Sequence, residues 1–188
     1  MPIMDKNQEN DYLCAAAQGD KKSFGILYSH YLEEIYRFVF IKIGNELTAE
    51  DITEETFIRI WESLPRYYKN NGKVKNLRAL LYRVANNLVI DHYRKRRPLE
   101  NIEENNPGSP PLAEKLAIDH EQSKQLVKYI RKLKPDYQQV ILLRLVNNLS
   151  HKEVASIMNI SEGNSRVLLF RAVKELKKML LKKDDSYA

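Results

Sequence analysis

Two charge clusters of opposite sign adjoin each other in the first half of this 188-residue chain. Residues 46–62 contain six carboxylates and one base, whereas residues 63–97 contain ten bases and one acid. A dense carboxylate surface attracts a positively charged partner, and a dense cationic surface attracts phosphates. The pattern therefore predicts two partners of opposite charge. Two solvated helix faces that attract each other are the plainer alternative.

A third charged segment lies near the C-terminus, where residues 124–188 carry 14 bases and six acids. Ser150 and Glu153 have the spacing of a capping box that opens a short helix, and residues 159–161 form a turn before a longer helix. Two helices joined by so short a turn are typical of a helix-turn-helix module, whose second helix enters the DNA major groove. An ordinary antiparallel helix pair is the alternative, but here the second helix is basic. Its cations are Arg166, Arg171, Lys174, Lys177 and Lys178.

These charged residues belong to segments in which apolar side chains recur at helical spacing. Asp20 is the predicted cap of one helix and Gly44 its predicted stop. The next helix is expected to end near Leu64, before Pro65. Strand alternation is absent, so the sequence predicts an all-α fold. The predicted helices cover about 11–18, 21–43, 48–64, 76–97, 119–133, 135–146, 150–158 and 162–181.

Residues 98–118 interrupt this helical pattern with four prolines and one glycine. A segment of this composition without helical or strand period is typical of a flexible linker. We therefore expect two small helical domains, an N-terminal helical bundle in residues 1–97 and a C-terminal helix-turn-helix domain in residues 119–188.

The composition is that of a soluble globular protein, with 43% hydrophobic and 30% charged residues and a net charge of +6. A single cysteine, Cys14, excludes an internal disulfide and favours a reducing compartment. We expect Cys14 to be a buried, small apolar residue. The N-terminus lacks the apolar core of a signal peptide, and no apolar stretch approaches the length of a membrane span. The sequence thus predicts a cytoplasmic protein without membrane insertion.

Catalytic chemistry finds little support in the sequence. A helical metalloenzyme that uses Glu50, Asp51, Glu54 and Glu55 is one alternative, but di-iron bundles need Glu-x-x-His pairs, and none of the four histidines belongs to one. The sequence also has no Gly-rich phosphate loop. We expect no enzyme activity, no cofactor and no metal. An adaptor that only binds another helical protein would leave the basic surfaces without a role.

Three segments together resemble the extracytoplasmic-function (ECF) type of RNA polymerase sigma factor, the dissociable promoter-reading subunit of the bacterial enzyme. AEDITEETFIRIW (49–61) resembles the family's polymerase-binding helix, and LLYRVANNLVIDHYRKRR (80–97) its minus-ten-reading helix. LSHKEVASIMNISEGNSRVLLFRA (149–172) resembles its minus-thirty-five-reading helix-turn-helix. The resemblance extends over residues 11–97 and 119–181.

For the acidic segment, the resemblance implies docking on core RNA polymerase through the β′ clamp helices. The resemblance also implies the β flap of the polymerase as a partner of the protein. Helical spacing puts Ile52, Thr56 and Ile60 on a face that packs into the bundle. The remaining side chains form a carboxylate surface with an apolar residue among them and two aromatic residues at its border. The predicted polymerase-binding residues are Asp51, Glu54, Glu55, Phe57, Ile58, Trp61 and Glu62.

For the basic segment, the resemblance implies capture of an unstacked minus-ten base and of the single strand beside it. Cations neutralise the backbone, while aromatic and amide groups hold the base. The predicted loop 67–73 has such groups between its cations. A favourable charge at a helix C-terminus is the alternative for the cations of 94–97. The predicted minus-ten residues are Tyr67, Tyr68, Arg83, Asn87, His92, Arg94, Lys95, Arg96 and Arg97.

For the helix-turn-helix, the resemblance implies base contacts from the second helix and backbone contacts from Arg144 and His151. The family often reads GTVKSRL where this chain has GNSRVLL (163–169). We expect Leu168 to face the core and Val167 to be able to meet a thymine methyl. This difference concerns which DNA sequence is read. The predicted minus-thirty-five residues are Arg144, His151, Asn164, Arg166, Val167, Phe170 and Arg171.

The sequence therefore predicts a sigma factor that binds core polymerase and directs promoter-specific transcription initiation by reading duplex and single-stranded promoter DNA. The resemblance also implies an anti-sigma factor as a partner. A two-domain helix-turn-helix regulator that acts without being a polymerase subunit is the alternative. Because the linker is flexible, we expect the isolated protein to bind promoter DNA poorly until core polymerase fixes both readers in place.

Overall fold

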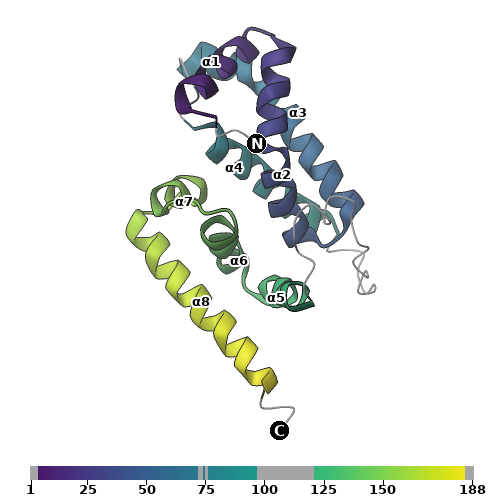
Figure 1. Ribbon diagram of the computed structural model, residues 1–188, viewed down its shortest axis with the longest axis vertical. Coiled ribbons are helices and arrows are strands. Elements are labelled where there is room, and N and C mark those ends of the chain that lie inside the picture. Colours follow the sequence, from purple (N-terminus) through teal and green to yellow (C-terminus); the bar gives the residue numbers. More distant parts are fainter. Residues whose placement is uncertain (1–3, 72–73, 75, 97–120, 185–188) are drawn as a thin grey trace. The chain divides into compact units, whose positions relative to one another are not determined.

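The structure, a computed structural model, describes residues 4–71, 74, 76–96 and 121–184 (Figure 1). The all-α prediction is confirmed, since these residues form helices and no strand. The predicted linker, 98–118, lies outside the described residues, so the proposed domain boundaries stay predictions. The helices are α1 (Lys6–Ala17), α2 (Lys21–Ile43), α3 (Glu46–Asn71), α4 (Leu77–Arg96), α5 (Glu121–Lys132), α6 (Pro135–Ile141), the π-helix η1 (Leu142–Val146), α7 (His151–Met158) and α8 (Glu162–Asp184).

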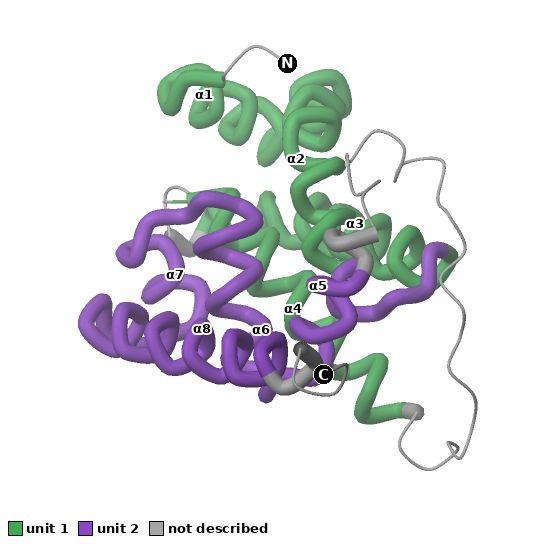
Figure 2. Tube along the Cα trace, turned by 60° about the horizontal axis from the view of Figure 1, so that its bottom comes forward, with its two compact units in different colours: residues 1–39, 47–104 green, residues 40–46, 105–188 purple. Residues whose placement is uncertain are grey.

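The chain divides into two compact units, which Figure 2 shows in green and purple. Unit 1 comprises residues 1–39 and 47–104, and unit 2 comprises residues 40–46 and 105–188. Helices α1 and α4, nearly all of α3 and most of α2 belong to unit 1, and helices α5 to α8 belong to unit 2. Each unit has its own set of buried apolar side chains.

The helices of unit 1 begin at polar caps. Asp5 accepts hydrogen bonds from the backbone N–H groups of Asn7 and Gln8, so α1 begins earlier than its apolar pattern predicted. Asp20 caps α2 as expected, and the helix ends before Gly44, which has φ +80°. Capping thus fixes where these helices begin, and a left-handed glycine fixes where α2 ends.

Helix α3 packs one face into unit 1, as the spacing predicted. Ile52, Thr56 and Ile60 are all buried. The Thr56 hydroxyl donates to the carbonyl of Ile52 at 2.7 Å, which satisfies its polar group within the helix. The opposite face of α3 therefore points to solvent.

The predicted end of α3 near Leu64 is wrong, because the helix continues through Pro65 to Asn71. A proline removes a single N–H donor, here the one that would reach the carbonyl of Trp61. Leu64 is fully buried, and Tyr68 is half-buried. Their packing outweighs the lost hydrogen bond. Residues 67–71 consequently lie in a helix and not in the predicted loop, and residues 72–73 lie outside the described part of the chain.

A polar clamp joins α2 to α4. Glu34 of α2 accepts hydrogen bonds from the Tyr82 hydroxyl at 2.7 Å and from Nε of Arg78 at 2.5 Å. Tyr82 has no exposed surface, and its ring meets Phe38 edge-on at 5.0 Å. Burial and the Glu34 carboxylate raise the pKa of Tyr82 far above its usual value. The Tyr82 hydroxyl therefore stays protonated and can donate to Glu34, and the clamp holds α4 against α2.

In unit 2, Pro135 lies in the first turn of α6, as predicted. The helix then widens into η1, where the N–H of Asn147 donates to the carbonyl of Leu142. This wider turn buries Leu142 and Leu143 and leaves Leu145 exposed. The backbone then turns back toward the start of α7.

Candidate interaction surfaces

The carboxylates of α3 form an exposed acidic face. Asp51, Glu54 and Glu62 are exposed, and Ile58 among them is 50% exposed. Glu55 accepts a hydrogen bond from Nε of Arg59 at 2.7 Å, an exposed pair that contributes little to stability. We call Asp51, Glu54, Glu55, Ile58 and Glu62 the acidic face. It combines negative charge with one accessible aliphatic side chain.

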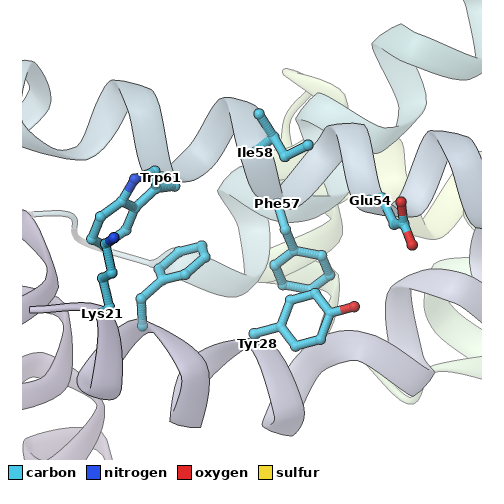
Figure 3. Close-up of a pocket in the computed structure, with 7 residues that line it drawn as sticks. Lys21, Tyr28, Glu54, Phe57, Ile58 and Trp61 are labelled. Atoms are coloured by element: carbon cyan, nitrogen blue, oxygen red, sulfur yellow. The ribbon is translucent and has the colours of Figure 1, made fainter.

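A hollow of about 370 Å³ lies between α2 and α3, directly beside the acidic face. Its walls include two pairs of aromatic rings, and each pair joins a ring of α2 to a ring of α3. The ring centroids of Phe24 and Trp61 are 4.9 Å apart, and those of Tyr28 and Phe57 are 4.7 Å apart. In Figure 3, Phe57 points from α3 toward Tyr28 of α2. This α2–α3 hollow is lined by Lys21, Phe24, Tyr28, Glu54, Phe57, Ile58 and Trp61.

The two predicted aromatic residues have different exposures. Phe57 is 3% exposed, so it belongs to the core, although it also lines the hollow. Trp61 is half-buried. Sequence reasoning did not identify the α2 wall of the hollow, which contains Phe24 and Tyr28. Their i, i+4 spacing indicates an aromatic side on α2, but it does not indicate which helix packs against that side.

Helix α4 carries the predicted minus-ten residues at its surface. Arg83 and Asn87 are exposed, and helical spacing puts Ile90 and Arg94 on the same side. Arg94 pairs with Asp91 at 3.1 Å, with 75% of its side chain exposed. Ile90 is 52% exposed, and sequence reasoning did not single it out.

The other minus-ten residues have mixed placements. Lys95 is exposed and His92 is half-buried, with its ring edge-on to Tyr93. The side chain of Arg96 and the whole of Arg97 lie outside what the structure describes.

The two tyrosines near the end of α3 differ in exposure. Tyr67 is at the surface, with 36% exposed, whereas Tyr68 is half-buried. Burial and the neighbouring Cys14 and Glu9 raise the pKa of Tyr68. Of the two, Tyr67 therefore offers the more accessible ring to a ligand.

Helix α8 presents most of the predicted minus-thirty-five residues to solvent. Phe170 is 70% exposed and Val167 is 48% exposed, while Leu168 is half-buried. Arg166 forms an ion pair with Glu162 one turn earlier. A second hollow, of about 390 Å³, lies beside this surface. It is lined by Asp136, Met158, Ile160, Asn164, Val167, Leu168 and Arg171.

The start of α7 is fixed by several polar contacts. Ser150 and Glu153 form the predicted capping box, and Arg144 donates to the carbonyl of Leu149. Nδ1 of His151 lies 3.0 Å from the hydroxyl of Ser165, a buried residue of α8. Sequence reasoning did not identify Ser165, although it is one of the residues that differ from the family pattern.

The electrostatic surroundings of His151 disfavour its charged form. Burial and the guanidinium groups of Arg144 and Arg166 lower its pKa from 6.5, while Glu162 opposes this shift. The imidazole is therefore predominantly neutral at neutral pH.

The prediction that Cys14 is buried is wrong, since its side chain is exposed. Helix α1 turns Leu13 and Ala16 into the core, which leaves Cys14 on the outer side. Within the described ranges, no three His, Cys, Asp or Glu residues are grouped so that they could hold a metal ion. Nor does any helix in those ranges combine the length and the apolar character needed to cross a membrane.

Two family models match this chain. Sigma-70 region 2 matches residues 27–98, and Sigma-70 region 4 matches residues 123–176. The first match covers α3, α4 and most of α2, and the second covers the helix-turn-helix. The acidic face, α4 and residues 162–176 of α8 therefore fall within the two matched regions.

Three curated relatives are ECF RNA polymerase sigma factors. SigM of Bacillus subtilis is 33% identical over 153 residues, which cover 80% of this chain and 91% of SigM. SigW of the same species is 29% identical over 175 residues, covering 87% of this chain and 91% of SigW. BldN of Streptomyces coelicolor is 32% identical over 171 residues, and the match spans 88% of this chain and 63% of BldN.

Solved structures share the fold. CnrH, in complex with the cytosolic domain of CnrY, aligns with a TM-score of 0.67 and 22% identity over 92% of this chain and 97% of CnrH. The sigma factor RpoE from Bartonella quintana, in complex with the anti-sigma factor NepR, aligns with a TM-score of 0.68 and 19% identity over 85% of this chain and 97% of RpoE. Together with the matched regions and the identity to SigM, this places the chain in the family of ECF RNA polymerase sigma factors.

Proposed function

We propose that this sigma factor docks on core bacterial RNA polymerase through α3 and directs initiation at promoters whose minus-ten element is read by α4 and whose minus-thirty-five element is read by α8. The observation that supports this assignment is the separation of charge by helix. The carboxylates gather on α3 beside an apolar hollow, and exposed cations lie on α4 and α8. Opposite charges on separate helices suit a protein that joins a basic enzyme surface to DNA.

The polymerase dock consists of the acidic face and the α2–α3 hollow beside it. Surface carboxylates mainly steer association and set the register, whereas a partly buried apolar anchor contributes most of the affinity. Ile58 and the exposed parts of Trp61, Phe24 and Tyr28 are accessible apolar groups at this dock. We assign the β′ clamp helices of the polymerase to this site, and the β flap to the second unit.

The minus-ten reader combines phosphate contacts with capture of a base. Arg94 and Lys95 are exposed for backbone contact, and Asn87 offers an amide on the side of α4 that carries Arg83. Tyr67 offers a ring surface on which a base can stack. These groups suit a melted strand better than a closed duplex, because stacking needs an unpaired base.

The minus-thirty-five reader is the first half of α8 in the major groove. Asn164, Arg166 and Arg171 can donate hydrogen bonds to base edges, and Val167 and Phe170 can contact thymine methyl groups. Arg144 and His151 are placed before and at the start of α7, the helix that crosses the DNA backbone in this motif.

We also propose an anti-sigma factor as a regulatory partner, since the structural neighbour RpoE is in complex with one. Such a protein would cover the exposed apolar residues of the dock or of α8 in the free sigma factor. The proposal implies that the protein is cytoplasmic, because the promoter DNA and the polymerase that it would bind are in the cytoplasm.

Transcription by purified core polymerase, with and without this protein, on a library of genomic fragments tests the proposal. We expect new transcripts that begin at fragments sharing two elements at a fixed spacing. Co-purification of the protein with core polymerase is the matching binding assay. If the protein neither associates with core polymerase nor changes the set of transcripts, the proposal is refuted, and a DNA-binding regulator outside the polymerase becomes the better account.

A further inference from the structure

We infer that Ser165 is a positioning residue, whose buried hydroxyl holds His151 as a neutral donor to a DNA phosphate beside the minus-thirty-five element. The inference rests on the proposed function of α7 and α8 as a DNA-reading pair. Ser165 itself would not touch DNA, since it has no exposed surface. It would act through His151.

The geometry joins the first turns of the two helices. His151 is the first residue of α7, and Ser165 lies in the first turns of α8, with its hydroxyl 3.0 Å from Nδ1 of the imidazole. The backbone beneath the ring is itself held, because Ser150 and Glu153 cap α7 and Arg144 donates to the carbonyl of Leu149. The ring is therefore fixed both at its backbone and at one of its two nitrogens.

The burial of Ser165 selects the tautomer of His151. A hydroxyl has one hydrogen to donate, and a buried hydroxyl that does not donate loses free energy relative to water. Within the described part of the chain, the hydrogen-bond partner of this hydroxyl is Nδ1 of His151. The hydroxyl therefore donates to Nδ1. A neutral imidazole that accepts at Nδ1 carries its proton on Nε2.

An Nε2–H group is a phosphate donor that requires no proton uptake. This matters here because charged groups from two elements surround the ring: Arg144 from η1, and Arg166 and Glu162 from α8. Burial and the two arginines lower the pKa of His151, so the imidazolium is scarce at neutral pH. The N-terminus of α7 also favours an anion beside its first residue. The tautomer selected by Ser165 thus lets the neutral His151 donate the hydrogen bond to phosphate that an imidazolium would otherwise donate.

The tautomer can be measured directly on the full-length chain by the ¹⁵N chemical shifts of its histidine rings, with His151→Gln used to assign the signal. We expect the Nε2–H form for His151 in the wild-type protein and a mixture of both forms in Ser165→Ala. This measurement needs neither DNA nor polymerase, and the wild-type spectrum alone tests the inference if the variant fails to fold. An Nδ1–H tautomer in the wild-type protein would overturn it.

The consequence for DNA binding can be measured with the holoenzyme on a promoter fragment selected with the wild-type protein. At about pH 8 we expect Ser165→Ala to weaken binding about three- to ten-fold, since one oriented hydrogen bond is lost. The ratio should fall toward one as the pH is lowered and His151 becomes protonated, because an imidazolium donates from both nitrogens whatever its neighbour. A merely structural loss would give a ratio that does not change with pH.

The variant His151→Gln provides the matched background. The glutamine amide can donate from nearly the position of Nε2 and has no tautomers, so Ser165→Ala should cost little binding when His151 is already replaced. An equal loss in both backgrounds would overturn the inference while leaving the proposed function intact. Failure of the wild-type holoenzyme to bind any selected fragment would overturn both.

Discussion

Replacing Ile58 by alanine tests whether the α2–α3 hollow and the acidic face form one dock. Ile58 is 50% exposed, so about half of its side chain is still available for burial by a partner. Complete burial of an isoleucine side chain contributes about 1.5–3 kcal/mol, and half of that is about 1 kcal/mol. We therefore expect Ile58→Ala to weaken binding to core polymerase about three- to twelve-fold, since 1.4 kcal/mol corresponds to a factor of ten.

The binding can be measured by titrating labelled core polymerase with the full-length protein and with Ile58→Ala. The matched control is Ile26→Ala, because Ile26 is 41% exposed on α2 but does not line the hollow. Both substitutions remove a half-exposed side chain, so their effects on the free energy of unfolding should be similar and small. Equal affinity for Ile58→Ala and wild type, or an equal loss with Ile26→Ala, would refute the assignment of this dock.

Other substitutions test the remaining surfaces. Reversing the charge at Asp51 and Glu55 should weaken polymerase binding, most strongly at low salt. The folding of unit 2, measured by thermal unfolding, should not change. Arg166→Ala should cost about 1–3 kcal/mol on one promoter element if it contacts a base, whereas an equal loss on all sequences would make it a phosphate contact. Tyr82→Phe should lower the free energy of unfolding by about 1.5–3 kcal/mol in urea, because it leaves the α2 carboxylate of the clamp with one donor fewer; no change would mean that the clamp is not stabilising. Tyr67→Ala should impair promoter opening, measured by permanganate reactivity, without weakening polymerase binding; a loss of binding instead would assign Tyr67 to the dock.

Local sequence signals predicted much of the fold, because they act within one or two turns of a helix. Asp20 and Gly44 bound α2 as expected, and the capping box at Ser150 opens α7. The buried side of α3 also followed from spacing alone, since a helix in contact with a core must turn every third or fourth residue inward. The all-α class and the helix-turn-helix needed no information from distant residues.

The features that were missed depend on contacts between distant segments. Local rules predicted that the helix ends before Pro65, but α3 continues through Pro65 because Leu64 is buried in the core. The aromatic wall of the α2–α3 hollow needs α2 and α3 side by side, which the spacing of Phe24 in its own helix does not reveal. Ser165 and His151 are separated by 14 positions in the sequence, so their hydrogen bond appears only once α7 and α8 are packed.

The continuation of α3 through Pro65 has a mechanical consequence for the proposed function. Ile58, at the dock, and Tyr67, the proposed base-stacking residue, lie nine positions apart on one helix. At 1.5 Å per residue this is about 14 Å along a single axis. A loop after Leu64 would have let the tyrosine move independently of the dock. A continuous helix instead means that whatever fixes the dock on core polymerase also fixes the position of the ring. Docking and base capture would then be coupled through the backbone of α3, without any change of fold.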